Sequence, residues 1–235
     1  VAVSGTYNQF AMWRMPDGEL LRTVSGGAGV PDEIAFSPDG QTFAVVWESW
    51  IAIRRVSDGA LVHNLSLGIA SSSYVKSVAY SPNGQAIVAG YTDRYVRVWD
   101  LSSWGVREIP TDGNGRHTDW IEAVAVTPDG QKVISGSADH SIKVWRLSDG
   151  AILRTLTGHS SIVESVTVTP DGQYIVSCSR DKTIKIWRLS DYKLVKTLSG
   201  VSGHIDYVNS VAISHDGRYM VSGSSDRTVK IWLVP

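Results

Sequence analysis

The sequence predicts an all-β fold, a β-propeller made of repeated four-stranded antiparallel sheets. Three observations lead to this prediction. One block of sequence recurs every 41 to 46 residues along the chain of 235. Each copy contains four short apolar stretches with strand-like alternation, separated by turn residues. No stretch has the apolar periodicity of an amphipathic helix. A propeller is typical of repeats with this length and strand content.

Six copies of the block can be aligned on one anchor position in the third strand. The anchor is a tryptophan in five copies and an arginine in the second. Copies with the same motif in register along a whole chain indicate one repeating structural unit rather than separate domains. The six anchors are Trp13, Arg54, Trp99, Trp145, Trp187 and Trp232.

Each copy predicts four strands, a to d, in a fixed order. Strand a is the alternating stretch at 162–169, and a Pro-Asp-Gly turn follows it, since Pro and Gly favour turn geometry. Strand b lies at 174–179. Strand c, as at 141–147, contains the anchor, and after a Ser-Asp turn strand d lies at 193–198.

The repeats predict 22 strands in a single domain over 1–235. The first blade lacks strand a and the last lacks strand d, so both are incomplete. The predicted blades are blade I at 1–25, blade II at 30–66, blade III at 73–110, blade IV at 119–157, blade V at 161–199 and blade VI at 206–235.

Composition excludes several classes of protein. Apolar residues make up 43% of the chain and charged residues 19%, which favours a packed core over disorder. The net charge of −1 disfavours a nucleic-acid partner. A single cysteine, Cys178, rules out an internal disulfide framework and a zinc site with several thiolates. No apolar run is long enough for a membrane helix.

Four short motifs recur in register: Ser-Pro-Asp-Gly, Ser-Gly-Ser-x-Asp, Ile-Lys-x-Trp and Gly-His. Together they resemble the WD-repeat (β-transducin-like) family over essentially the whole chain. Only Trp99-Asp100 keeps the literal Trp-Asp pair. The resemblance implies a seven-bladed ring closed by an N-terminal strand, and we therefore expect this chain to be truncated at its N-terminus.

A histidine, a serine, an aspartate and the anchor tryptophan recur at the same spacing in three copies. These residue types could form a hydrolase triad, but a hydrolase needs one nucleophile in one cleft, not three equal sets. The family resemblance implies a structural hydrogen-bonded chain instead. The three sets are His117, Ser135, Asp139 and Trp145; His159, Ser177, Asp181 and Trp187; and His204, Ser222, Asp226 and Trp232.

The sets decay toward the N-terminus. In blade III the equivalent residues are Ser71, Ala89, Asp93 and Trp99, so only the aspartate and the tryptophan remain. We therefore expect the N-terminal blades to be less stable or to be held by other contacts. Arg54 replaces the anchor of blade II, either as substitute packing with its charge reaching solvent or as part of a surface adapted to a partner.

Lysines recur two residues before three of the anchors, at Lys143, Lys185 and Lys230. We expect this position to lie on a solvated outward face of the blades.

The family resemblance also implies that the d–a and b–c loops share one face, which commonly binds peptides or proteins. Three aromatic side chains and several charges fall there, a composition typical of an interaction hot spot. The alternative is that the aromatics simply cover the ends of strands. The candidate partner-binding residues are Tyr74, Lys76, Trp120, Glu122, Glu164, Arg180, Tyr207 and Asn209.

The predicted function is a non-catalytic scaffold or sensor module for protein or peptide partners, within a larger multidomain protein or complex. We expect no catalytic residues, cofactor or metal, and neither nucleic acid nor membrane as a partner. The expected location is the cytoplasm, with the nucleus as the alternative. The alternative function is a small-ligand-binding or hydrolytic propeller with its site in the central channel.

Overall fold

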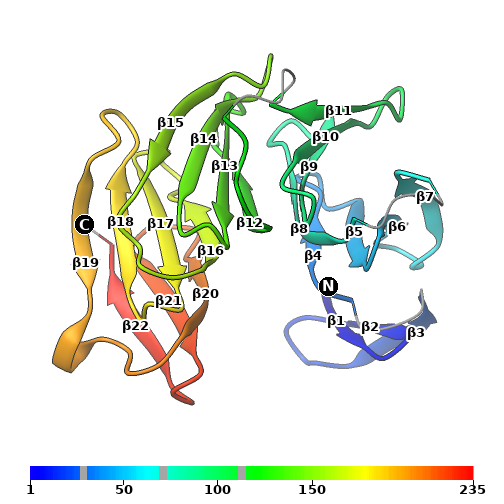
Figure 1. The fold of residues 1–235 in the computed structure, drawn as a ribbon. Helices are drawn as coiled ribbons and strands as arrows, with labels where there is room; N and C mark the ends of the chain where they lie inside the picture. Colours follow the sequence, from blue (N-terminus) through cyan, green and yellow to red (C-terminus); the bar gives the residue numbers. More distant parts are fainter. Residues whose placement is uncertain (27–30, 69–72, 111–114, 235) are drawn as a thin grey trace.

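The computed structural model describes residues 1–26, 31–68, 73–110 and 115–234. These residues form 22 strands in six antiparallel sheets and one short 3-10 helix, η1 (Gly200–Ser202). Figure 1 shows the sheets following one another along an open arc, in chain order from β1–β3 to β20–β22. The predicted all-β fold of propeller blades is therefore confirmed. We number the sheets I to VI in chain order.

Sheets I to III form the N-terminal half of the arc. Sheet I contains β1 (Ala2–Thr6), β2 (Gln9–Trp13) and β3 (Leu20–Ser25). Sheet II contains β4 (Ile34–Phe36), β5 (Thr42–Trp47), β6 (Trp50–Arg55) and β7 (Leu61–Ser66). Sheet III contains β8 (Val75–Tyr80), β9 (Ala86–Tyr91), β10 (Val96–Asp100) and β11 (Val106–Ile109).

Sheets IV to VI form the C-terminal half. Sheet IV contains β12 (Ile121–Val126), β13 (Lys132–Ser137), β14 (Ile142–Arg146) and β15 (Ile152–Leu156). Sheet V contains β16 (Val163–Val168), β17 (Tyr174–Ser179), β18 (Ile184–Arg188) and β19 (Leu194–Leu198). Sheet VI contains β20 (Val208–Ile213), β21 (Tyr219–Ser224) and β22 (Val229–Leu233). Two ends of the predicted blades, Val30 and Pro235, lie outside the described residues.

The turns between strands a and b follow from their residue types. In sheet IV, the Thr127 hydroxyl donates to the Asp129 carboxylate at 2.5 Å and accepts from the backbone N–H of Lys132 at 3.0 Å. Gly130 has a φ of 68°, a left-handed conformation that glycine adopts without steric cost. Because these bonds close the turn locally, strands a and b meet in one register.

The hydrophobic core lies between neighbouring sheets rather than within one. Each cluster combines residues from two consecutive sheets, for example Ile134 and Val144 of sheet IV with Val163 and Trp187 of sheet V. The anchor tryptophan of a sheet packs in the core that it shares with the sheet before it, as Trp99 does with residues of sheet II. Sheet-on-sheet packing therefore fixes the angle at which each blade presents its loops.

The C-terminal end of the arc differs from its middle. In sheet VI, the face of β22 turned away from Trp232 carries Val229, Ile231 and Leu233, each about 70% exposed. Middle sheets bury the corresponding face against the next sheet. Among the described residues no helix is long and apolar enough to cross a membrane.

Candidate interaction face

The predicted partner-binding residues lie at one end of the sheets, where strand a begins and strand b ends; we call this end the loop face. Tyr74, Trp120 and Tyr207 directly precede β8, β12 and β20. The carbonyl of each accepts a backbone hydrogen bond from the b–c loop of its own sheet, and the Ala138 N–H donates to Trp120 at 2.8 Å. The backbone of these aromatic residues is therefore fixed by the sheet, not by a free loop.

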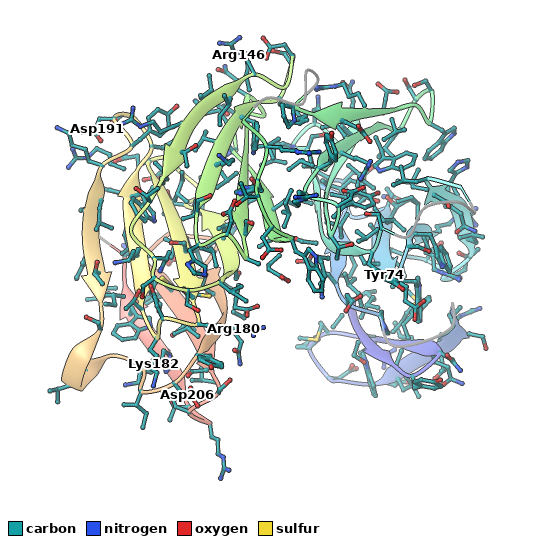
Figure 2. All side chains as sticks on the ribbon, viewed as in Figure 1. Tyr74, Arg146, Arg180, Lys182, Asp191 and Asp206 are labelled. Atoms are coloured by element: carbon teal, nitrogen blue, oxygen red, sulfur yellow. The ribbon has the colours of Figure 1, made fainter. Side chains whose placement is uncertain are left out.

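The three aromatic side chains remain half exposed. Tyr74 is 52% exposed, Trp120 50% and Tyr207 45%. A hollow of about 270 Å³ lies between Tyr74 and Trp120, with Thr92 and Asp93 in its wall. Figure 2 shows Tyr74 and Arg180 on facing arms of the arc. Exposed aromatic rings on a fixed backbone can bury area against a partner at low entropic cost.

The structure brings Glu164, Arg180 and Tyr207 together across sheets V and VI. The Arg180 guanidinium donates to the Glu164 carboxylate, and its carbon lies 5.7 Å from the centre of the Tyr207 ring. The Asn209 amide donates to the Ser225 hydroxyl at 3.0 Å. Because Arg180 is exposed, its charge and the ring beneath it are both accessible to a partner.

Lys76 and Glu122 continue this surface on sheets III and IV. Each is the second residue of its strand, β8 for Lys76 and β12 for Glu122, and each is partly buried. Burial raises the pKa of the Glu122 carboxyl, the Lys76 ammonium lowers it, and the neighbouring Glu164 carboxylate raises it again. The eight predicted residues therefore lie on four consecutive sheets, with charges of both signs between the aromatic rings.

The three His–Ser–Asp–Trp sets lie one to a sheet, in sheets IV, V and VI. In sheet V the Trp187 indole donates to Ser177 Oγ at 3.0 Å, Ser177 Oγ lies 2.8 Å from His159 Nε2, and His159 Nδ1 lies 2.7 Å from Asp181 Oδ2. A carboxylate only accepts, so His159 Nδ1 donates to Asp181. The sets of sheets IV and VI have the same bonds, at 2.7 to 2.9 Å.

The environment of these sets gives their serines no route to a substrate. Ser135 and Ser177 are fully buried, and each hydroxyl already accepts from an indole. Burial alone would raise the pKa of the Asp139 carboxyl, but hydrogen bonds from His117 and Ser141 hold that pKa well below its usual range. Burial lowers the pKa of the His117 imidazole. In sheet IV, a neutral His117 on an ionised Asp139 orients the hydrogen-bonded set, whose serine, imidazole and indole all have partners.

Sheet III replaces this set with different residues, which the sequence pattern did not identify. The Trp99 indole donates to the Tyr91 hydroxyl at 3.2 Å. The Arg97 guanidinium lies over the Tyr91 ring and donates to Asp93 at 3.0 Å and to Glu108 at 2.6 Å. Ser71, at the position of the histidine, lies outside the described residues. Sheet III is thus held by other contacts.

Arg97 also corrects the expectation for the recurring lysines, because it occupies the same strand-c position. Lys185 is only 8% exposed, and its ammonium donates to the Thr197 hydroxyl at 3.2 Å. Lys143 and Lys230 are partly buried as well. The expectation of a solvated outward face is therefore wrong. Lys143 and Lys185 reach hydroxyls of strand d in their own sheets, and Lys230 reaches the carbonyls of Ser202 and Gly203. Their aliphatic stems can pack while their charges find oxygen acceptors.

Arg54, the substitute anchor of sheet II, is buried. Its guanidinium donates to the Gly59 carbonyl at 3.0 Å and lies 5.0 Å from the centre of the Phe10 ring of sheet I. Trp47 and Trp50 stack at the other end of the same strand pair, with ring centres 6.3 Å apart. Of the two alternatives for Arg54, its position favours substitute packing between sheets I and II.

A second feature missed by the sequence pattern is Glu33, just before β4. Its carboxylate accepts a hydrogen bond of 2.5 Å from the backbone N–H of Val78 in the next sheet. Burial raises the pKa of Glu33 to about 7, although that hydrogen bond and one from Ser77 lower it. Within the described residues, no three His, Cys, Asp or Glu side chains cluster closely enough to hold a metal ion.

Comparison with known proteins places these features among repeats of one kind. The family model described as WD domain, G-beta repeat, matches residues 60–100, 114–146, 150–188 and 192–232. These matches cover sheets IV and V, most of sheet III and much of sheet VI.

Several curated proteins are similar over about half of this chain. An uncharacterized WD repeat-containing protein, sll1491, of Synechocystis is 31% identical over 119 residues, which cover 50% of this chain and 33% of that protein. The small ribosomal subunit proteins RACK1 of Candida albicans and Caenorhabditis elegans are 30% and 32% identical over 105 and 108 residues, in each case 43% of this chain and 33% of the relative. The chain matches about a third of the length of each of these relatives.

Proposed function

We propose, from the premise that this chain belongs to the WD-repeat family, that it is a non-catalytic module for protein interaction. Its partner is a protein or peptide that binds the loop face of sheets III to VI. The observation that carries the proposal is the set of half-exposed rings of Tyr74, Trp120 and Tyr207, one on each of three sheets. Such rings with interspersed charges have the composition of protein-binding hot spots.

The charges give this proposed site its specificity. Arg180 offers an exposed cation beside Tyr207, and the carboxylates of Glu164 and Glu122 lie on sheets V and IV. A partner with a buried apolar anchor and charges of both signs fits this pattern, because complementary charges select the orientation of binding. We include in the proposal that this binding occurs in the cytoplasm or the nucleus.

We also propose that the three His–Ser–Asp–Trp sets are structural. Their serines are buried in three separate sheets, and each hydroxyl is engaged by an indole and an imidazole. A catalytic serine needs access to a substrate carbonyl and an oxyanion hole. The sets instead join the d–a loop, strand b and strand c of one sheet, which holds the loop face in place.

The test is capture of partners from a cell extract by the immobilised chain, repeated with the double variant Trp120→Ala plus Tyr207→Ala. We expect proteins retained by the wild type to be lost from the double variant, because the two rings supply most of the exposed aromatic area of the face. Tyr219→Ala is the matched control, since Tyr219 is 47% exposed and lies at the far end of sheet VI. Unchanged capture by the folded double variant would place the site elsewhere.

A further inference from the structure

A groove lies between sheets III and IV, at the end of the sheets opposite the loop face. Its volume is about 660 Å³, within the size range of ligand sites. Ala86, Val98, Val106 and Leu147 line it with apolar side chains. Figure 2 shows Arg146, which also lines the groove, far from Arg180 of the loop face. The remaining lining includes the amide side chains of Asn83, Gln85 and Gln131.

Beside this groove, strand d of sheet III lacks a residue that strand d of sheets I, II, IV and V has. In sheets I, II, IV and V, the register between strands c and d shifts beside the anchor and leaves one apolar residue of strand d unpaired. In β11 the register runs without a shift. The unpaired residues are Leu21, Val62, Leu153 and Val195.

The next interface along the arc shows what the missing residue would fill. In sheet IV, the unpaired Leu153 packs against the core between sheets IV and V, and Leu189 of sheet V is buried there. Leu147, the counterpart of Leu189, is only partly buried in the groove. The space between sheets III and IV is therefore open at the point where the space between sheets IV and V is closed.

Arg107 lines this groove. Its Nη2 donates to the Leu147 carbonyl across the two sheets, but its Nη1 is buried and has no hydrogen-bond partner. The carboxylates around it are already engaged: Asp100 accepts from the Ser102 hydroxyl at 2.6 Å, and Asp149 pairs with Arg146 at 2.6 Å. A buried donor without an acceptor costs free energy that a ligand oxygen would recover.

We propose that this groove is a second peptide-binding site, which takes an extended segment carrying one carboxylate next to an apolar side chain. The carboxylate pairs with the Arg107 guanidinium, which turns toward the groove so that Nη1 gains an acceptor. The apolar side chain covers Val98 and Leu147, and the amides at the lip pair with the peptide backbone. The site is independent of the loop face, so either can exist without the other.

The charge around the groove favours a carboxylate over a phosphate. Among the described lining residues, Arg107 Nη1 is the only buried cationic nitrogen without a partner, and Asp100 also lines the groove. One guanidinium matches a single negative charge. A phosphate group with nearly two charges needs a second cation, and Arg146, which also lines the groove, is already paired with Asp149.

The binding test uses three capped tripeptides that differ in one residue: Leu-Glu-Leu, Leu-Gln-Leu and Leu-phosphoserine-Leu, each acetylated and amidated. They are titrated into the ¹⁵N-labelled chain, and the backbone amide signals of Gly130 and Gln131 report occupancy. We expect the Glu peptide to shift these signals and the Gln peptide to bind at least tenfold more weakly, because it loses the charged hydrogen bond.

Two variants with matched controls locate the site. Arg107→Gln should weaken the Glu peptide at least tenfold, whereas Arg154→Gln, at the equivalent paired position of sheet IV, should not. Should Arg107→Gln disturb folding, Gln131→Glu tests the same site through an exposed side chain. Its added charge should weaken the Glu peptide about fivefold, and Gln173→Glu in sheet V should leave binding unchanged.

Three results would overturn the proposal. No signal change at Gly130 and Gln131 with millimolar Glu peptide would mean that the groove binds no such peptide. Equal affinity for the Glu and Gln peptides would remove the role of Arg107. Tighter binding of the phosphoserine peptide would replace the carboxylate by a phosphate. None of these results bears on partner capture by the loop face.

Discussion

Sheets III and V have the same four-stranded pattern, but different buried polar residues surround their anchor tryptophans. In both sheets the anchor tryptophan packs on the sheet before it and its indole N–H needs an acceptor. Sheet V supplies Ser177, which His159 and Asp181 hold in place. Sheet III supplies the Tyr91 hydroxyl, and Arg97 covers its ring. The scaffold therefore requires a buried acceptor for the indole, and the His–Ser–Asp chain is one way to provide it.

The two sheets differ in how far the carboxylates of these polar groups are exposed to solvent. In sheet V the aspartate is buried and bonded to a histidine, a hydroxyl and a backbone N–H. In sheet III the carboxylates of Asp93 and Glu108 reach solvent on either side of the buried guanidinium. Loss of one partner should therefore cost more in sheet V, where water cannot reach the group left behind.

The contacts between sheets show a parallel difference. The backbone N–H of Val124 donates to the neutral Ser77 hydroxyl at 3.0 Å, which joins sheets III and IV. The equivalent bond between sheets II and III runs from Val78 to the Glu33 carboxylate. The same position of strand a thus has a neutral acceptor, Ser77, in sheet III and a titratable acceptor, Glu33, in sheet II. Only the contact made by Glu33 should change in strength with pH.

The largest expected effect is that of His159→Ala. It leaves Asp181 and Ser177 buried with fewer partners, and we expect the free energy of unfolding to fall by about 3 kcal/mol. Urea denaturation followed by tryptophan fluorescence measures it. His215→Ala is the control, because His215 is exposed in a turn, and it should change stability by less than about 0.5 kcal/mol. Equal midpoints for the two variants would contradict the structural role of the set.

The same variant has a pH dependence with a defined sign. Burial alone would raise the pKa of Asp181, but hydrogen bonds from His159 and Thr183 hold it well below its ordinary value. The native state therefore keeps Asp181 ionised at pH values where the unfolded chain protonates it. This contribution is present above about pH 4 and is lost as the pH falls further. The deficit of His159→Ala should shrink on acidification.

Glu33→Gln is expected to stabilise the chain by about 2 kcal/mol at pH 8. The native pKa of Glu33 is raised to about 7 from 4.5, so the unfolded chain releases this proton first as the pH rises. Wild-type stability thus falls between about pH 4.5 and 7 and then levels off. Glutamine keeps an oxygen for the Val78 N–H but has no charge to desolvate. Denaturation at pH 5 and pH 8 tests this: a gain that is the same at both values would contradict it.

The sequence could predict features set by repeated motif positions, but not contacts made by residues that occur in only one repeat. The anchors and turn residues recur, so the all-β fold and the sheet order could be predicted from their spacing. The residues of the loop face could also be placed on one end of the sheets, because they occupy repeated positions. Glu33 and Arg97 are single substitutions whose partners are distant in sequence or specific to one sheet. The missing register shift of β11 changes pairing without a motif, so the groove beside it had no sequence signal.

Arg97→Met is expected to have the smallest effect of the three, a loss of about 1 kcal/mol relative to Lys143→Met at the same position of sheet IV. Methionine preserves the packing on the Tyr91 ring but leaves Asp93 and Glu108 without their cation. Both carboxylates can then be hydrated, since they are 30% and 48% exposed. The Trp99 indole keeps its bond to Tyr91 and stays packed on sheet II. A loss greater than that of His159→Ala, measured by the same denaturation, would reverse the ranking of the two interiors and would mean that sheet III depends on its guanidinium more than sheet V depends on its histidine.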